Sequence, residues 1–81
     1  MQAQDIERLI EEQLPGARAR VRSDDGVHFE AVVISDAFAV KSLVQQHRLV
    51  YAALGERLAR EDIHALALKT CTPDAWQKQP S

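Results

Sequence analysis

The sequence lacks the cysteine pairs, long apolar runs and residue patterns from which disulfide frameworks, membrane spans and common catalytic motifs are built. It contains one cysteine among 81 residues, and aromatic residues make up 5%. A single cysteine excludes an internal disulfide and is compatible with a reducing compartment. No apolar run approaches the roughly 18 residues of a membrane-spanning helix. A phosphate-binding glycine loop, a CxxC pair and a Ser-His-Asp order are absent too, so we expect no enzyme.

Charge is nearly balanced, with 10 Lys and Arg against 12 Asp and Glu and a net charge of -2. Proteins held to nucleic acid by bulk electrostatics are usually basic, so any such site here would be a local patch. The N-terminal segment is acidic and amphipathic, without the apolar core of a secretory signal. With 46% hydrophobic residues, the chain suits one small cytoplasmic domain over residues 1–81, with a core at about 3–78.

Hydrophobic spacing and turn residues predict a mixture of helices and strands. In chain order they are a helix over residues 3–13, strands over 17–23 and 27–35, a long helix over about 42–60, a strand over 63–70 and a short helix capped by Thr72. The crossover makes the second and third strands parallel if they are neighbours. The fold class is therefore α+β, with the order αββααβ, or αββαβ if the long helix is unbroken.

A hairpin joins the first two strands through Asp24-Asp25-Gly26. A three-residue loop places Arg22 opposite His28, whereas a two-residue loop shifts the register by one. Because the first strand alternates strictly, Arg18, Arg20 and Arg22 share one face. That row is either a phosphate-tracking stripe or, as we favour, an ordinary exposed strand face.

One apolar stripe runs along the long helix. It comprises Leu43, His47, Val50, Leu54 and Leu58, spaced by three or four residues. We expect this stripe to cover the sheet. Because His47 lies within it, the simplest interpretation of that residue is a packed histidine satisfied by a local acceptor.

Two histidines are candidates for a metal site. His28 lies one residue into the second strand, and His64 lies one residue into the third. If those strands are parallel neighbours, both histidines sit at the same end of the sheet, on strands about 4.8 Å apart. Two imidazoles there can converge on one iron or zinc ion, or on a small cluster. The alternative for each is a half-exposed histidine at a strand end, without a ligand.

Lys41, Arg48 and Cys71 can each be interpreted either as functional residues or as residues with no role beyond the fold. Arg48 projects near the azimuth of Lys41, so the two form either a small basic face or a solvated surface pair. Cys71 comes just before the capped C-terminal turn. A small residue at a strand end is favoured there over a reactive thiol.

Four segments resemble the BolA-like family, in particular its small IbaG-type branch. They are SDDGVHF, VVISDAF, LVQQHRLVYAAL and IHALALKTCTPDAW, and the resemblance runs over roughly residues 5–78. It implies a class II KH-like fold, a three-stranded mixed sheet with helices packed on one face. The GxxG loop by which KH domains clamp RNA is absent. The family usually has glycine in F-x-G-K, where this chain has Phe38-Ala39-Val40-Lys41.

The resemblance also implies a non-enzymatic adaptor that pairs with a monothiol glutaredoxin. The pair shares a [2Fe–2S] cluster in iron–sulfur cluster trafficking, iron homeostasis or stress response. The strand histidine of the family corresponds to His64, and the second ligand falls on or near His28. Since a two-iron cluster needs about four ligands, thiolates are expected from the glutaredoxin and glutathione. No metal is expected in the isolated chain.

Two other functions stay open at this point. One is a KH-like nucleic-acid-binding transcriptional regulator, whose contacts would come from Lys41 and Arg48. The other is an interaction module without a metal, in which His64 is merely structural.

Overall fold

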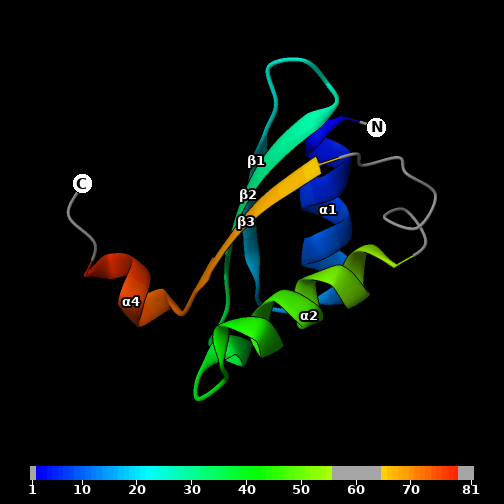
Figure 1. Ribbon diagram of the computed structural model, residues 1–81. Coiled ribbons are helices and arrows are strands. Elements are labelled where there is room, and N and C mark those ends of the chain that lie inside the picture. Colours follow the sequence, from blue (N-terminus) through cyan, green and yellow to red (C-terminus); the bar gives the residue numbers. More distant parts are fainter. Residues whose placement is uncertain (1, 56–64, 79–81) are drawn as a thin grey trace.

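The computed structural model of the protein describes residues 2–55 and 65–78. The elements are α1 (Ala3–Gln13), β1 (Arg18–Arg22), β2 (His28–Ile34), the 3-10 turn η1 (Asp36–Phe38), α2 (Leu43–Leu54), β3 (Ala65–Cys71) and α4 (Pro73–Gln77). Figure 1 shows α1 and α2 on one side of the sheet, and α4 beyond the end of β3. The predicted α+β class with a three-stranded sheet is confirmed. Within the described ranges, no helix is long and apolar enough to cross a membrane.

The sheet is mixed, with the strand order β1-β2-β3. β1 and β2 are antiparallel, and β2 and β3 are parallel. The second and third strands are neighbours, and the parallel direction predicted for that case is confirmed. His28 pairs with Ala65 at one end, and Ile34 pairs with Cys71 at the other. The direction of these two strands decides which side chains can meet at each end of the sheet.

The core lies between the sheet and the two long helices. Its most buried large side chains are Phe38, Ile6, Ile10, Leu54, Val33 and Val50. Side chains alternate along each strand, so Phe29, Ala31 and Val33 of β2 face this core while His28 and Glu30 do not. The opposite face of the sheet therefore carries the polar side chains, including the arginine row of β1.

Two carboxylates of α1 cover the outer edge of β1. Glu7 Oε2 accepts a hydrogen bond from the Val21 N–H at 2.7 Å, and Glu11 Oε2 accepts one from the Ala19 N–H at 3.1 Å. An open strand edge presents unpaired N–H groups to which other chains can add. The acidic face of α1 satisfies two of these donors and closes that edge.

The predicted hairpin register is wrong by two residues. Arg22 pairs with Glu30 rather than with His28, because the connecting loop takes up all of residues 23–27. A shift by an even number leaves every side chain on its predicted face. The arginine row and His28 therefore still share the sheet face that is turned away from the core.

The prediction for the long helix is wrong in two respects, namely its C-terminal boundary and the burial of part of its apolar stripe. α2 ends at Leu54, because Gly55 adopts a positive φ of 53° that terminates the helix. Residues 56–60, with the predicted stripe member Leu58, lie outside the described residues. Leu43 is 61% exposed, whereas Val50 is fully buried. The buried apolar side chains of α2 therefore lie in its C-terminal half.

The connection between η1 and α2 is tied to both the helix and the sheet by one side chain. Gln46 Nε2 donates to the carbonyls of Phe38 and Lys41, at 3.2 and 3.0 Å. Its Oε1 accepts a hydrogen bond from Thr70 Oγ1 of β3 at 2.6 Å. Phe38 is buried beneath the connection, as predicted from the sequence.

The same connection contains a strained turn. The Lys41 N–H donates to the Phe38 carbonyl at 3.3 Å, and Ala39 has φ -59° and ψ 138°. Val40 follows with a φ of 55° and is fully exposed. This is the geometry of a type II turn, whose third residue favours glycine. Val40 is β-branched and occupies the position at which the F-x-G-K pattern has glycine, so the chain keeps the turn at the cost of strain.

Val40→Gly is expected to raise the free energy of unfolding by about 1 kcal/mol, because relief of the strain exceeds the added entropy of the unfolded chain. The thermal midpoint should rise by about 4–8 °C per kcal/mol in a domain of this size. Thermal denaturation followed by far-ultraviolet circular dichroism measures it. Val27→Gly is the matched control, since Val40 alone among described non-glycine residues has a positive φ, and this control should lose stability. A lower midpoint for Val40→Gly would contradict the strain.

Candidate functional site

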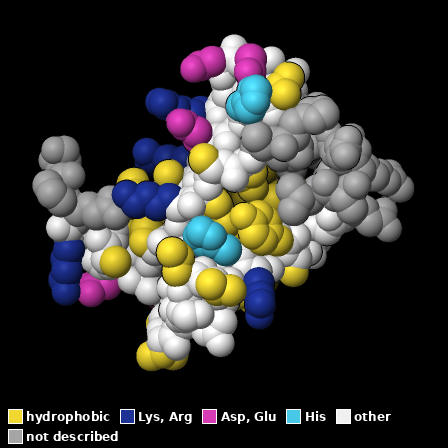
Figure 2. All heavy atoms as spheres, viewed as in Figure 1, with side chains coloured by type: hydrophobic (Ala, Val, Ile, Leu, Met, Phe, Trp, Pro, Cys, Tyr) yellow, Lys and Arg dark blue, Asp and Glu magenta, His cyan; other side chains and the backbone are white. Residues whose placement is uncertain are grey.

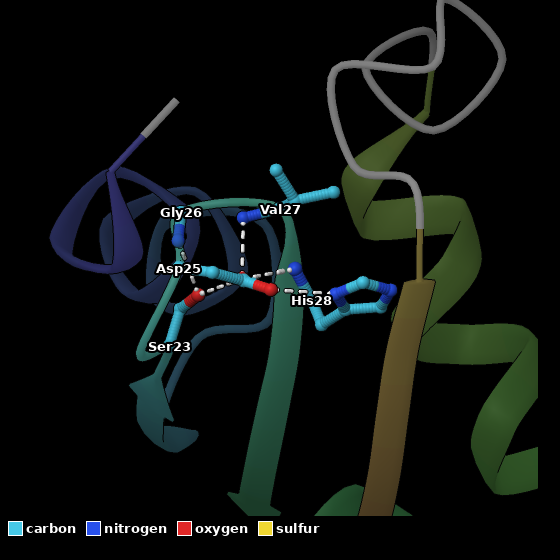
Figure 3. A network of polar contacts seen from close by, with 5 residues as sticks. All are labelled: Ser23, Asp25, Gly26, Val27 and His28. Atoms are coloured by element: carbon cyan, nitrogen blue, oxygen red, sulfur yellow. Dashed lines mark hydrogen bonds and ion pairs between the residues drawn. The ribbon is translucent and has the colours of Figure 1, made fainter.

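The hairpin loop is organised by one aspartate. Asp25 Oδ1 accepts hydrogen bonds from the backbone N–H groups of Val27 and His28, at 2.9 and 2.8 Å. Ser23 Oγ accepts from the Gly26 N–H at 2.8 Å and donates to Asp25 Oδ1 at 3.3 Å (Figure 3). Aspartate favours such turns because its short side chain reaches the backbone two or three residues ahead. These contacts fix the loop at the start of β2.

The second oxygen of Asp25 holds the ring of His28. Asp25 Oδ2 lies 2.7 Å from His28 Nδ1, and the two side chains are 52% and 72% exposed. The hydrogen bond from the His28 side chain, and then those from the N–H groups of His28 and Val27, hold the pKa of Asp25 well below its usual range. An ionised carboxylate only accepts hydrogen bonds, so Nδ1 carries the proton. Whenever the ring is neutral, this tautomer leaves the lone pair of Nε2 available to a ligand.

The ring projects from the start of β2 toward the start of β3 (Figure 3). An open cavity of about 310 Å³ lies beside it, with His28, Glu30 and Ala67 in its lining. Arg22 also lines this cavity, and its Nε donates to Glu30 Oε2 at 2.8 Å. Figure 2 shows acidic side chains and one histidine at the hairpin end of the molecule, and apolar side chains toward α2. His28 is thus accessible to a partner from the hairpin end.

The second predicted ligand, His64, lies outside the described residues. Its neighbour in the sequence, Ala65, begins β3 and is the register partner of His28. The predicted pairing of the two imidazoles stays a prediction. In the described part of the chain, no three His, Cys, Asp or Glu side chains form a group that could hold a metal ion.

Cys71 lies at the opposite end of the sheet from His28. It pairs with Ile34, the last residue of β2, whereas His28 is the first. Six residues of strand at about 3.3 Å each separate the two ends by roughly 20 Å. The thiol is buried, which raises its pKa, while Lys69 opposes this shift in part. Cys71 is therefore a strand-end core residue, as the sequence favoured, and does not share a site with His28.

The remaining candidates lie on or beside α2. The ring of His47 stands edge-on to Tyr51, with centroids 6.4 Å apart and an interplanar angle of 79°. Its Nε2 is buried without a hydrogen-bond partner in the described part of the chain, so the predicted local acceptor is not found there. Lys41 precedes α2 and Arg48 lies within it, and both are exposed.

Sequence reasoning missed the role of Asp25. It identified Asp25 as a turn residue and found His28 through strand polarity, but did not connect the two side chains. The spacing of three residues between them was the available signal, because an aspartate in a turn accepts hydrogen bonds two to three residues ahead.

Comparison with known proteins identifies the family. The model of the BolA-like protein family matches residues 9–75. An uncharacterized protein of Haemophilus influenzae is 33% identical over 78 residues, which cover 96% of this chain and 91% of that protein. The DNA-binding transcriptional regulator BolA of Escherichia coli is 37% identical over 60 residues, covering 74% of this chain and 56% of the regulator. The chain belongs to the BolA-like protein family.

Some matched relatives are considerably longer. BolA-like protein 1 of Bos taurus is 47% identical over 53 residues, which cover 65% of this chain and 38% of the cow protein. The chain therefore spans less than two thirds of the length of the cow protein and of the Escherichia coli regulator.

Solved structures of this family share the fold. A bolA protein homologue from Coxiella burnetii has a TM-score of 0.87 and 43% identity, and the match covers 96% of this chain and 99% of that one. The BolA domain of SufE1 from Arabidopsis thaliana has a TM-score of 0.76 and 32% identity, with 90% and 93% covered. Yeast Fra2 has a TM-score of 0.76 and 32% identity, with 96% and 86% covered.

Native Cys71 is expected to react with iodoacetamide at pH 7.5 at least about tenfold more slowly than in the urea-unfolded chain, because burial disfavours the thiolate. Mass spectrometry of timed samples measures the rate, and glutathione in the same two buffers corrects for the effect of urea on the reagent. Equal rates in the native and unfolded chains would show that the thiol is accessible.

Proposed function

We propose that this protein is a non-enzymatic adaptor that binds a monothiol glutaredoxin and supplies histidine ligands to a [2Fe–2S] cluster shared by the two proteins. Its role would be iron–sulfur cluster trafficking, iron homeostasis or the stress response. The observation that carries the proposal is His28, whose exposed ring is fixed through Nδ1 by Asp25. Metal-ligating histidines almost always donate their other ring N–H to a carboxylate, a carbonyl or water.

The donor set of the chain fits one part of such a cluster. Imidazole nitrogen is an accepted ligand of a [2Fe–2S] centre, and histidine on one iron raises the reduction potential. When bound, the cluster would supply an iron–sulfur unit that can be transferred and a redox couple. His28 would hold it through Nε2, and His64, which lies outside the described residues, would supply the second imidazole.

The other ligands must come from a partner. The only thiol of the chain, Cys71, is buried at the far end of the sheet. A two-iron cluster takes about four ligands, so two thiolates are needed from outside this chain. A monothiol glutaredoxin with glutathione offers this pair. The presence of the SufE1 BolA domain and yeast Fra2 among the similar structures supports a role connected with iron–sulfur chemistry.

Addition of the protein to a [2Fe–2S]-loaded monothiol glutaredoxin is expected to change the visible circular dichroism of the cluster, because imidazole replaces part of its ligand set. His64→Ala should abolish the change. His28→Ala should reduce the affinity of the complex by at least about tenfold, by analogy with the loss of groups that support metal sites.

The third histidine provides the control for this experiment. His47→Gln changes a ring that packs on Tyr51 of α2, and it should leave the cluster spectrum unchanged. Far-ultraviolet spectra of all variants establish that they are folded. A cluster spectrum that wild-type protein does not alter would exclude the shared cluster.

A second function is supported by the Escherichia coli relative, which is named a DNA-binding transcriptional regulator. The corresponding candidate surface here comprises Lys41 and Arg48, which are both exposed around the first half of α2. A net charge of -2 restricts any such contact to a local patch. We place this function second because no GxxG loop accompanies the two cations.

If this patch binds duplex DNA, Lys41→Ala combined with Arg48→Ala should weaken binding and reduce the slope of log affinity against log salt by about 2, from the loss of two phosphate contacts. Fluorescence anisotropy with a labelled duplex at several salt concentrations measures both effects. Arg18→Ala combined with Arg20→Ala removes the same charge from the sheet and is the control. Unchanged binding by the Lys41 and Arg48 double variant would exclude the patch.

A further inference from the structure

We propose that Asp25 is a positioning residue that fixes the tautomer and direction of the His28 ring, so that Nε2 is preset as a ligand before any partner arrives. The inference rests on the proposed function, since it assigns a purpose to the free nitrogen. It goes beyond that function because it concerns a carboxylate that would not itself touch the cluster.

Both carboxylate oxygens of Asp25 take part in hydrogen bonds, one with the backbone and the other with the His28 ring. Oδ1 accepts from the backbone N–H groups of Val27 and His28, while Oδ2 faces Nδ1 of the His28 ring at 2.7 Å. The backbone contacts fix the carboxylate, and the carboxylate fixes the ring (Figure 3). Hydrogen bonds of one carboxylate therefore link the loop, the start of β2 and the imidazole.

A contribution to folding stability does not explain the contact between the Asp25 and His28 side chains. Exposed ion pairs contribute little to folding, and both side chains are more than half exposed. The backbone contacts through Oδ1 would already close the turn without the histidine. The contact through Oδ2 adds a defined ring orientation and a defined tautomer, which are the properties that a metal ligand requires.

Asp25→Asn separates the two roles of the carboxylate. The asparagine carbonyl can still accept from the N–H groups of Val27 and His28, so the turn is retained. Its NH2 group then takes the place of Oδ2 and donates to Nδ1. This reverses the tautomer: the proton moves to Nε2, and the lone pair needed for ligation is lost from the exposed nitrogen. Asp24→Asn removes the same charge from the adjacent position and is the matched control.

The first measurement uses the chain alone. Long-range 1H–15N spectra at about pH 8.5, where imidazoles are generally neutral, show which ring nitrogen of His28 carries the proton. We expect Nδ1–H in the wild type and in Asp24→Asn, and Nε2–H in Asp25→Asn. His28→Ala assigns the signals. Thermal midpoints that stay close to that of the wild type would establish that the fold is intact.

The second measurement titrates each variant with [2Fe–2S]-loaded monothiol glutaredoxin and follows the visible circular dichroism. Loss of the group that holds a metal-binding histidine in place typically costs about 10–100-fold in metal affinity, and Asp25→Asn should show a loss of this order. Asp24→Asn should bind like the wild type.

The results separate the two claims. A reversed tautomer together with weaker binding in Asp25→Asn supports the inference. A wild-type ring protonated on Nε2 overturns it, as does full affinity in Asp25→Asn while the wild-type complex forms, and the adaptor function then stands without it. If the wild-type protein leaves the cluster spectrum unchanged, the proposed adaptor function is wrong. The role proposed for Asp25 in presenting His28 Nε2 to a cluster is then wrong as well.

Discussion

The parallel pairing of β2 with β3 is the constraint on which the rest of the structure depends. It places the first residue of β2, His28, beside the first residue of β3, Ala65, and it places Cys71 at the far end. An antiparallel pairing of the same strands would bring the cysteine to the hairpin end instead. Strand direction thus determines that the accessible end of the sheet offers imidazole and that the thiol is buried elsewhere.

The two faces of the sheet have different roles, one in packing and one at the surface. One face packs against α1 and α2 and contains the core, while the other carries the arginine row and His28. α1 also closes the outer edge of β1 through Glu7 and Glu11, so that edge is not available for strand addition. A partner that reaches His28 therefore meets the hairpin end of the sheet, where Asp25 has already set the ring.

Much of this could be predicted from the sequence, because strand alternation and the long crossover are local and topological features. The strands themselves, and the parallel direction of β2 and β3 for the case that they are neighbours, followed from them, and with these the position of His28. The hairpin register did not, since it depends on hydrogen bonds inside the loop: Asp25 draws Val27 and His28 into the turn and moves Arg22 opposite Glu30.

Periodicity continued the long helix past Gly55, where the backbone instead turns to a positive φ. The link between Asp25 and His28 depends on side-chain geometry, which no periodicity encodes.

The central claim is that a histidine nitrogen of this chain binds a cluster held by a partner. Pulsed electron paramagnetic resonance of the reduced complex tests it most directly, with 15N-histidine in this chain and an unlabelled glutaredoxin. Imidazole bound directly to iron should give strong hyperfine coupling from 15N, and this coupling should be reduced in His28→Ala. Only weak coupling in the wild-type complex, typical of nitrogen outside the ligand set, would contradict it.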